Sequence, residues 1–334
     1  MKKSPIQKSS ILITGGAGYI GSHIAKQLAE AGERIIILDD LSTGYTQNIL
    51  VDDFIIGNCG DSALVSRILQ EYNVETVIHL AASIIVPESI QQPLKYYENN
   101  VVNTCRLLNC CTQANIKHFI FSSSAAVYGS QEKCLVDENN VCNPINPYGR
   151  SKLICEQILQ DITLATPLRY VALRYFNVGG ADLEEKIGLR NPNATTLIKI
   201  AAQTALGIKP TLAIYGTDYP TSDGTAIRDY IHVEDIASAH LQALIYLRNN
   251  KPSVVLNCGY GHGYSVLQVL EAVQRLAKTT LNIQTLPRRP GDPAELIADN
   301  RKILETLAWK PQLADLDIII QSSLNWEKNL LKSA

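Results

Sequence analysis

The first half of the chain alternates short runs of apolar, β-branched residues with longer segments of helical periodicity. The short runs predict strands at Ser10–Thr14, Arg34–Leu38, Thr76–Leu80, His118–Ser122 and Tyr170–Leu173. The longer segments between them predict helices at Tyr19–Ala31, Ser62–Tyr72, Leu94–Asn115 and Pro147–Leu164. Near-continuous apolar strands are typical of a parallel sheet that helices cover on both faces. The alternation therefore predicts the α/β class, with a Rossmann-type, doubly wound parallel sheet.

Beyond about residue 176 the pattern becomes less regular. Further helices are predicted at Thr195–Leu206, Val233–Leu247, Arg301–Leu307 and Leu316–Leu331, and further strands at Thr211–Tyr215 and Val254–Asn257. No low-complexity linker separates these segments from the first half. We therefore expect a Rossmann domain over residues 9–176, which residues 229–258 rejoin. Residues 177–228 and 259–330 would form a smaller, discontinuous C-terminal domain.

The composition excludes several classes of protein. The chain has 334 residues, of which 46% are hydrophobic and 19% charged, and its formal net charge is -2. This balance does not favour nucleic acid as a partner. Apolar runs fall short of the roughly 20 residues that a membrane-spanning helix needs, so no membrane association is expected. The eight cysteines lack C-x-x-C or zinc spacing, which predicts free thiols, no metal site and a cytoplasmic location.

The first predicted strand runs directly into a glycine-rich turn. Gly15, Gly18 and Gly21 form a GxxGxxG pattern between this strand and the helix that follows. Such glycines allow the backbone to approach a pyrophosphate, which the helix N-terminus binds through free N–H groups and its dipole. Asp39 ends the second strand, where a carboxylate accepts from a ribose 2'-hydroxyl and repels a 2'-phosphate. The pattern therefore predicts NAD as cofactor rather than NADP.

A tyrosine and a lysine on one face of a predicted helix supply candidate chemistry. Tyr148 and Lys152 are one helical turn apart. The pKa of a free tyrosine is about 10, and a cation roughly 5 Å away lowers it by stabilising the phenolate. Ser124 follows the fourth predicted strand, at the sheet edge where ligands bind in this type of fold. These residues predict a site where a phenolate removes the proton of a substrate hydroxyl.

The glycine loop, the serine after the fourth strand and the Tyr-x-x-x-Lys pair occur in an order that resembles the extended short-chain dehydrogenase/reductase superfamily. Four finer motifs resemble the UDP-glucose (UDP-galactose) 4-epimerases within it. They are Tyr-Tyr-Glu-Asn-Asn at 96–100, Leu-Arg-Tyr-Phe-Asn-Val-Gly-Gly-Ala at 173–181, Gly-Thr-Ala-Ile-Arg-Asp-Tyr-Ile-His-Val at 224–233 and Pro-Arg-Arg-Pro-Gly-Asp at 287–292. The resemblance extends over about residues 9–330 and implies an NAD-binding first domain and a UDP-sugar-binding second domain.

The resemblance assigns roles to individual residues. It implies a catalytic trio of Ser124, Tyr148 and Lys152. The implied cofactor site comprises Gly15, Gly18, Tyr19, Ile20, Gly21, Asp39, Leu41, Ser42, Thr43, Gly44, Asn58, Cys59, Leu80, Ala81, Ala82, Asn99, Ser122, Tyr148, Lys152 and Phe176. The implied substrate site comprises Ser124, Tyr148, Asn177, Thr196, Leu197, Ala213, Tyr215, Arg228, Arg289, Asp292 and Leu296, with the two arginines on the diphosphate.

The implied reaction is redox-neutral inversion at carbon 4 of a UDP-hexose, which interconverts UDP-glucose and UDP-galactose. Tyr148 would take the proton of the 4-hydroxyl with the help of Ser124. Hydride would pass to NAD, the 4-keto sugar would rotate, and hydride would return to its opposite face. Lys152 would lower the pKa of Tyr148 and bind the nicotinamide ribose.

Three positions depart from the best-known bacterial pattern of the family. Asn58 stands where an aspartate commonly faces the adenine amine, and Ile84 replaces a lysine near the nicotinamide ribose. Thr196 replaces an asparagine in the sugar-nucleotide loop. These departures concern the tightness of cofactor binding and the details of substrate binding, and they leave the reaction class unchanged.

Other reactions on the same fold are the alternatives. Nucleotide-sugar dehydratases carry an Asp-Glu pair where this chain has Ala125 and Ala126, and the glutamate of UDP-glucuronate decarboxylases is missing there too. Leu296 is neither the large aromatic that excludes an N-acetyl group nor a very small residue that clearly admits one. UDP-N-acetylglucosamine, UDP-N-acetylgalactosamine and UDP-pentoses therefore stay open as substrates. A non-catalytic NAD-binding regulator would typically lack Tyr148 or Lys152.

The resemblance also suggests an oligomeric state. By family analogy alone, we expect a homodimer in which the predicted helices Leu94–Asn115 and Pro147–Leu164 of two copies pack as a four-helix bundle.

Overall fold

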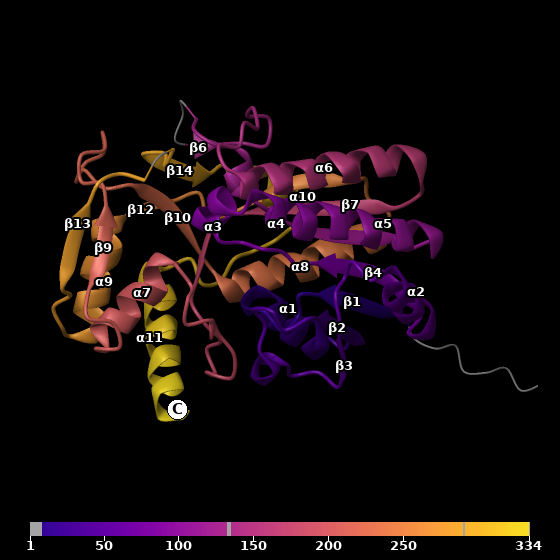
Figure 1. Cartoon of the computed structure of the whole chain (residues 1–334), viewed down its shortest axis with the longest axis horizontal. Coiled ribbons are helices and arrows are strands. Elements are labelled where there is room, and N and C mark those ends of the chain that lie inside the picture. Colours follow the sequence, from indigo (N-terminus) through magenta and orange to yellow (C-terminus); the bar gives the residue numbers. More distant parts are fainter. Residues whose placement is uncertain (1–8, 132–134, 290, 334) are drawn as a thin grey trace, which may run out of the picture.

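A seven-stranded parallel sheet organises most of the chain (Figure 1). The computed structural model describes residues 9–131, 135–289 and 291–333. The strand order is β11-β7-β5-β4-β1-β2-β3, and every neighbouring pair is parallel. The strands are β1 (Ser10–Thr14), β2 (Ile35–Asp39), β3 (Asp53–Ile56), β4 (Val74–His79), β5 (His118–Ser124), β7 (Arg169–Tyr175) and β11 (Val254–Cys258). This confirms the predicted α/β, doubly wound fold.

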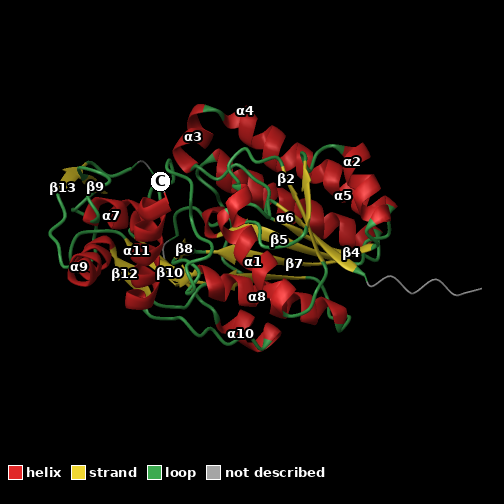
Figure 2. Ribbon diagram, turned by 90° about the horizontal axis from the view of Figure 1, so that it is seen from below, coloured by secondary structure: helices red, strands yellow, loops and turns green. Residues whose placement is uncertain are grey.

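Helices cover both faces of this sheet (Figure 2). One face carries α1 (Tyr19–Glu30), α8 (Val233–Arg248) and α10 (Arg301–Leu307). The other face carries α2 (Ser62–Glu71), α5 (Asn103–Gln113) and α6 (Pro147–Ala165). Because all neighbouring strands are parallel, the carboxyl ends of the seven strands lie at one edge of the sheet.

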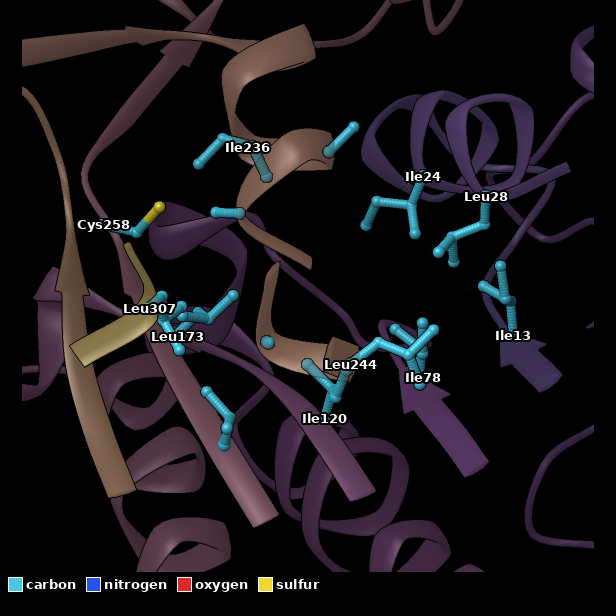
Figure 3. Close-up of a cluster of buried hydrophobic side chains, with 14 of the residues drawn as sticks. Ile13, Ile24, Leu28, Ile78, Ile120, Leu173, Ile236, Leu244, Cys258 and Leu307 are labelled. Carbon is cyan, nitrogen blue, oxygen red and sulfur yellow. The ribbon is translucent and has the colours of Figure 1, made fainter. Parts of the chain in front are cut away.

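Each face of the sheet has its own hydrophobic core. Ile11 and Ile13 of β1 pack with Ile24 and Leu28 of α1 in one core, whereas Leu12 belongs to the other. Figure 3 shows the first core, where Ile78, Ile120 and Leu173 of the central strands lie among residues of the covering helices. Successive side chains of a strand point to opposite faces, so a strand buried on both faces is apolar at nearly every position.

The remaining segments form a smaller layer beside the carboxyl edge of the sheet. Its helices α7 (Leu197–Ala205), α9 (Val266–Ala277) and α11 (Leu316–Ser333) enclose a third apolar cluster. One small sheet has the order β12-β10-β14-β6, and β8 pairs with β10. Its strands are β6 (Leu135–Val136), β8 (Asn177–Gly179), β10 (Ile227–His232), β12 (Gly263–Ser265) and β14 (Glu295–Ala298). A second sheet joins β9 (Leu212–Tyr215) to β13 (Ile283–Leu286).

These cores support a division of the chain into two units. We propose that residues 9–176 form one unit together with α8 and β11, which lie against the main sheet. Residues 177–228 and most of 259–330 form the other. The expected boundary at residue 229 falls inside β10, whose residues 227–229 pair with β12 while its residues 230–232 pair with β8. Since a strand is one rigid element, we place this boundary after His232.

Several elements differ from the sequence prediction. The structure adds β3 to the main sheet and α9 to the smaller layer, where we had predicted neither. Strand β3 is a short, only partly buried strand at the edge of the sheet, and its apolar run is limited to residues 54–56. The helix predicted at Leu94–Asn115 consists of α4 (Pro93–Tyr96), a π-helical segment Tyr97–Val102 and α5, with the short helix α3 (Val86–Gln91) before it. Such π-helical turns interrupt α-helices at functional sites.

Two further predictions concern whole-chain properties. Within the described ranges, no helix is long and apolar enough to cross a membrane, and no group of His, Cys, Asp and Glu side chains could hold a metal ion. The seven cysteines in these ranges are free thiols. Cys134 lies outside the described residues, as does Pro290 of the predicted Pro287–Pro293 loop.

Candidate active site

The topology of the main sheet fixes where a ligand can bind. The chain proceeds outward from β1 through β2 to β3 in one direction, and outward from β4 through β5, β7 and β11 in the other. In open α/β sheets, ligands bind at the carboxyl ends of the strands where this reversal occurs. Here the reversal lies between β1 and β4, and the turns after them touch. The amides of Leu80 and Ala81 donate to the carbonyl of Thr14 at 3.0 and 3.1 Å.

The glycine loop lies in this reversal. Gly15 has a positive φ of 75°, and a Cβ there would lie 2.6 Å from the backbone nitrogen of Ala81. A Cβ on Gly21 would collide with the Gly15 carbonyl. The first intrahelical bond of α1 runs from Ser22 N to Gly18 O at 3.0 Å, so the amides of residues 19–21 have no acceptor within the helix. The loop therefore presents a close backbone surface and free N–H groups to an anion.

Asp39 occupies the expected place at the end of β2. Its side chain is buried, and its two oxygens accept from the amides of Ala17 (2.9 Å) and Leu41 (2.8 Å). Burial raises the pKa of this carboxyl, and the two amide bonds oppose the rise. Because each carboxylate oxygen has two acceptor sites, Asp39 can still accept from a ribose hydroxyl. A Cβ on Gly44 would lie 2.8 Å from Asp39 Oδ1, so this loop passes close to the carboxylate.

The segment expected at the adenine is held by its own hydrogen bonds. Asn58 donates through Nδ2 to Asp40 Oδ2 at 3.1 Å and accepts through Oδ1 from the amide of Gly60 at 2.8 Å. Cys59 beside it is buried, and burial raises the pKa of its thiol to about 12. Ser42 and Thr43 are exposed on the loop after β2, and Leu41 before them is half-buried. The amide oxygen of Asn58, which stands in for the usual carboxylate, is thus already an acceptor within the chain.

Helix α6 carries the candidate base. Asn146 caps its N-terminus by accepting from the amide of Gly149 at 2.8 Å, and Pro147 occupies the first turn, where it is well tolerated. The cap fixes Tyr148 in the first turn, opposite Ser124 at the end of β5. Burial raises the pKa of Tyr148, and a hydrogen bond with the Ser124 hydroxyl opposes this. Ser124 and Tyr148 are therefore paired as the sequence predicted.

Lys152 lies one turn further along α6 and is almost fully buried. Its ammonium donates to the carbonyl of Ser122 at 2.7 Å and lies 5.0 Å from the centre of the Phe121 ring. Burial lowers its pKa to about 8. We predicted that Lys152 lowers the pKa of Tyr148. The pKa of Tyr148 is raised overall, because loss of hydration outweighs the hydrogen bond with Ser124, and the Lys152 ammonium donates to the Ser122 carbonyl, so the lowering by Lys152 stays a prediction.

The π-helical segment positions the loop after β4. Asn100 accepts from Ser83 N (2.8 Å) and donates to Ser83 O (2.9 Å) and to Ser151 Oγ (3.0 Å). Its neighbour Asn99 donates to Ser83 Oγ at 3.0 Å. Ser83, which directly follows the predicted cofactor residues Leu80, Ala81 and Ala82, is therefore connected through Asn100 to Ser151 of α6. The sequence reasoning named Asn99 but missed Asn100, although both stand in the 96–100 motif.

A small apolar cluster joins the catalytic loop to the second unit. It contains Ala125 after Ser124, Phe176 after β7 and, partly buried against them, Leu296 of β14. Leu296 lies opposite Arg228 in the pairing of β10 with β14. Phe176, a predicted cofactor residue, and Leu296, a predicted substrate residue, thus belong to one cluster although 120 positions separate them in the chain.

The predicted diphosphate arginines lie on two neighbouring segments. Arg228 donates to the carboxylate of Asp292 in a short ion pair and to the carbonyls of Ile227 and Pro293, each at 2.7 Å. Arg289 is exposed, and its guanidinium carbon lies 3.8 Å from the centre of the Tyr215 ring. The remaining predicted substrate residues are Asn177 and Thr196, which are exposed, and Leu197 and Ala213, which are half-buried.

Comparison with known proteins assigns this arrangement to a family. The model of the NAD dependent epimerase/dehydratase family matches residues 11–259. A UDP-glucose 4-epimerase of Azospirillum brasilense is 47% identical over 324 residues, which cover 97% of this chain and 93% of that protein. The chain belongs to this epimerase family.

Solved structures of UDP-glucose 4-epimerases are similar to this chain in fold and sequence. The NAD complex of UDP-glucose 4-epimerase from Brucella ovis is 42% identical, superimposes with a TM-score of 0.93, and matches 95% of this chain and 98% of its own. The UDP-Glc/GlcNAc 4-epimerase of Campylobacter jejuni is 46% identical with a TM-score of 0.85, over 96% and 100% of the two chains.

The residues of this epimerase-family chain fit NAD. A side chain at position 15 or 21 would collide with the neighbouring backbone, so glycine at both positions keeps the loop open beside the N-terminus of α1. Asp39 supplies a carboxylate at the end of β2 that would repel a 2'-phosphate. The glycine loop would hold the pyrophosphate, and Lys152, whose ammonium donates to the Ser122 carbonyl of β5, would lie on the nicotinamide side.

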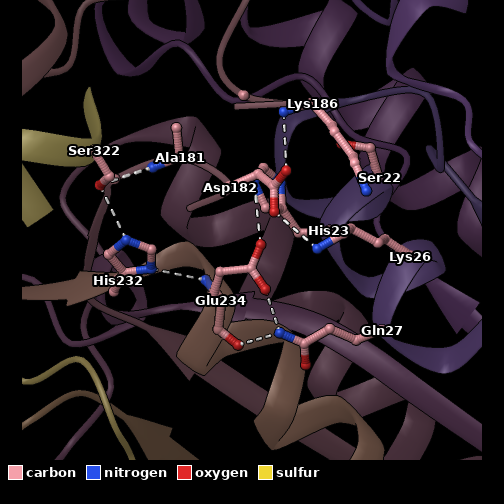
Figure 4. A network of polar contacts seen from close by, with 12 residues as sticks. Ser22, His23, Lys26, Gln27, Ala181, Asp182, Lys186, His232, Glu234 and Ser322 are labelled. Carbon is pink, nitrogen blue, oxygen red and sulfur yellow. Dashed lines mark hydrogen bonds and ion pairs between the residues drawn. The ribbon is translucent and has the colours of Figure 1, made fainter. Parts of the chain in front are cut away.

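The side chain of Tyr19 connects the cofactor helix to the second unit. Its hydroxyl donates to the carbonyl of Gly180 at 2.6 Å, while its backbone amide is one of the free N–H groups at the start of α1. Figure 4 shows a polar network of the same helix, in which Lys26 of α1 pairs with Asp182 at 2.8 Å and Gln27 with Glu234 of α8. In this epimerase-family fold, the cofactor helix is thus tied to the segment that begins the second unit.

The close approach at Gly15 predicts a cofactor defect. A Gly15→Ala substitution should weaken NAD binding by roughly 10–100-fold, because backbone strain and the contact with Ala81 cost about 1–3 kcal/mol. Titration of NAD into the stripped protein by calorimetry measures this. Gly207→Ala is the matched control, since Gly207 also has a positive φ (73°) but a Cβ there would meet nothing within 4 Å. Equal NAD affinities of the two variants would contradict the prediction.

Proposed function

We propose that this chain is an NAD-dependent UDP-glucose 4-epimerase that interconverts UDP-glucose and UDP-galactose. The observation that carries the proposal is the pairing of Tyr148 with Ser124 beside the buried Lys152, at the carboxyl edge of a dinucleotide-binding sheet. The names of relatives at 42–47% identity over nearly the whole chain support the same activity.

The side chains of the protein remove and return one proton at the 4-hydroxyl of the sugar. NAD, when bound, supplies the acceptance and return of a hydride at carbon 4. Tyr148 removes the hydroxyl proton and later gives one back, while Ser124 holds the oxygen through its hydroxyl. Since the same proton and hydride are returned, the net change is inversion rather than oxidation.

The local electrostatics require a cation beside the phenol. Burial alone raises the pKa of Tyr148. Lys152, whose pKa is about 8, is mostly protonated at pH 7 and supplies a positive charge one turn away. His79 of β4 hydrogen-bonds to Thr14 and Thr104, and burial lowers its pKa to about 3, so it adds no competing charge. Lys152 is therefore the residue whose protonation governs the alkaline limit of the activity.

The two residues after Ser124 lack the acidic and basic groups that an elimination reaction needs. Ala125 is buried in the cluster with Phe176, and Ala126 donates its amide to Ser124 Oγ at 3.2 Å. Neither methyl group can exchange a proton. A dehydratase needs an acid and a base at this point, so the arrangement favours epimerisation.

The substrate would be held by its diphosphate. Arg228 holds Asp292 and the backbone that follows it, which shapes the loop, and Arg289 presents its guanidinium from the same loop. Arginine forks match phosphate oxygens. A diphosphate fixed by Arg289 and Arg228, with Tyr215, Ala213, Leu197, Thr196 and Asn177 around the nucleoside, leaves the hexose free to turn between two orientations.

Purified protein should show this activity without added reductant. We expect NAD to be released on acid denaturation, and UDP-galactose to be converted to UDP-glucose in a proton NMR assay. A panel with UDP-N-acetylglucosamine and UDP-xylose should show slower turnover. Bound NAD with no turnover of any UDP-sugar would instead identify a non-catalytic NAD-binding regulator, and loss of water from the sugar would identify a dehydratase.

Removal of the phenol hydroxyl tests the assigned base. Tyr148→Phe should lower kcat by about 100–10,000-fold with little change in NAD content, since general base catalysis contributes that much. The control is Tyr246→Phe, whose hydroxyl donates to the carbonyl of Pro252 at 2.9 Å on α8. Full epimerase activity of Tyr148→Phe, measured with UDP-galactose, would refute the assignment.

We also propose a homodimer formed through α5 and α6. These helices lie side by side on one face of the sheet (Figure 1). Leu94 of α4 is 80% exposed beside them, Cys105 of α5 is exposed, and Ile154 and Ile158 of α6 are half-buried. An apolar strip of this kind on two adjacent helices supports packing against a second copy.

Light scattering tests this interface. Leu94→Glu should shift the protein from dimer to monomer, because it places a charge in the contact. Leu183→Glu, at a leucine 58% exposed in the segment after β8, should leave the dimer intact. A monomeric parent protein would disprove the proposal.

A further inference from the structure

A third residue shares the catalytic face of α6. Glu156 lies one turn beyond Lys152 and two turns beyond Tyr148, so all three side chains point toward β5. Glu156 is 5% exposed and Lys152 is 3% exposed. Helical spacing thus places a buried carboxylate directly behind the buried ammonium.

Glu156 joins the catalytic helix to two strands. Arg174 of β7 donates to it through Nε (3.0 Å) and Nη2 (2.6 Å), a two-point ion pair. Ser123 of β5, which adjoins Ser124, donates its hydroxyl to the same carboxylate in a short bond. The carboxylate therefore fixes α6 relative to the strand that carries the catalytic serine.

Arg174 extends this network to the segment after Ser124. Its Nη1 donates to the Tyr128 hydroxyl at 2.9 Å, and its guanidinium carbon lies 4.8 Å from the centre of that ring. The Tyr128 hydroxyl donates in turn to Asn257 Oδ1 of β11 at 2.6 Å. The network thus spans β5, α6, β7 and β11, and each of its members is buried.

Stability alone gives little reason for such a network. A well-packed apolar pair of similar volume is often as stable as a buried ion pair, or more so. We propose that Glu156 and Arg174 are positioning residues of the epimerase: they hold Tyr148 and Lys152 in register with Ser124 and keep a negative charge one turn from the Lys152 ammonium. This inference rests on the proposed function of the site.

The surroundings of Lys152 leave Glu156 as its main anionic neighbour. The titratable groups that interact with the ammonium are Cys155 and Glu156 on α6 and His79 on β4. Burial raises the pKa of the Cys155 thiol to about 12, and His79 is neutral above about pH 3, so neither is charged near pH 7. Glu156 raises the pKa of Lys152, against the larger lowering caused by burial.

Two variants and a control test the proposal in the holoenzyme. Glu156→Gln should lower kcat for UDP-galactose by about 10–100-fold, with KM within about twofold, because misplaced catalytic groups affect the transition state more than binding. It should also move the alkaline limb of kcat to lower pH, since the protonated form of Lys152 loses its partner. Ser123→Ala, which changes no charge, should give a smaller fall in kcat, about 3–10-fold.

The control removes a comparable number of hydrogen bonds far from the site. Arg248 donates to Glu33 and Glu75 through four bonds between 2.6 and 2.9 Å. Arg248→Gln should lower the melting temperature while the pH profile and kcat stay at parent values. If Glu156→Gln does not fold, Ser123→Ala alone decides: parent kcat in that variant would overturn the proposal.

A direct titration separates this inference from the proposed function. The side-chain carbon signal of Lys152, assigned by its loss in Lys152→Met, reports the pKa of the ammonium by NMR in the NAD-loaded protein. We expect that pKa to fall by about one unit in Glu156→Gln and to stay unchanged in Arg248→Gln. An unchanged Lys152 pKa in Glu156→Gln would overturn the positioning role. If the parent protein epimerises no UDP-sugar, the proposed function is refuted. The titration then still shows whether Glu156 sets the pKa of Lys152.

Discussion

The close contact of two backbone turns, Gly15 after β1 and Leu80–Ala81 after β4, constrains the rest of the structure. These turns can touch only because Gly15 lacks a side chain and adopts a positive φ. Their contact aligns the carboxyl ends of the two innermost strands, where the direction of the sheet reverses. The free amides at the start of α1, the carboxylate of Asp39 and the end of β5 then face one place. Binding of a dinucleotide at this point follows from the sheet topology and the missing Cβ.

A second constraint is electrostatic and concerns what burial does to the groups of α6. Loss of hydration makes Tyr148 harder to ionise and Lys152 easier to deprotonate. Left alone, these two effects would oppose a phenolate next to an ammonium. The fold counters them with hydrogen bonds of fixed geometry: Ser124 to the phenol, the Ser122 carbonyl to the ammonium, and the carboxylate of Glu156 one turn behind. The chemistry of the pair is thus a property of the helix and strand together.

The contacts between the two units, made by β10 and by the segment after β8, connect the cofactor helix to the small sheets. Strand β10 pairs with β8 at one end and with β12 and β14 at the other, and α8 of the main fold begins directly after it. Two contacts of the cofactor helix α1 stabilise the same region: the Tyr19 hydroxyl donates to the Gly180 carbonyl, and Lys26 pairs with Asp182. Under the proposed function, a site built across this region would hold the nucleotide end of the substrate rigidly, while Phe176 and Leu296 of the apolar cluster would make few directional contacts with the sugar.

The sequence by itself determined the class of fold, because strands buried on both faces must be apolar at nearly every position, and it located Gly15, Asp39, Ser124, Tyr148 and Lys152 through local spacing. It did not reveal β3, which is a short, partly buried edge strand, or the π-helical turn, whose residue Asn100 hydrogen-bonds to Ser83 and Ser151. Only the tertiary structure decided the sign of the Tyr148 pKa shift, the use of the Tyr19 hydroxyl and the pairing of Glu156 with Arg174. Each of these features depends on burial or on partners distant in the chain. Local periodicity in the sequence predicts neither the burial of a particular group nor its distant partners.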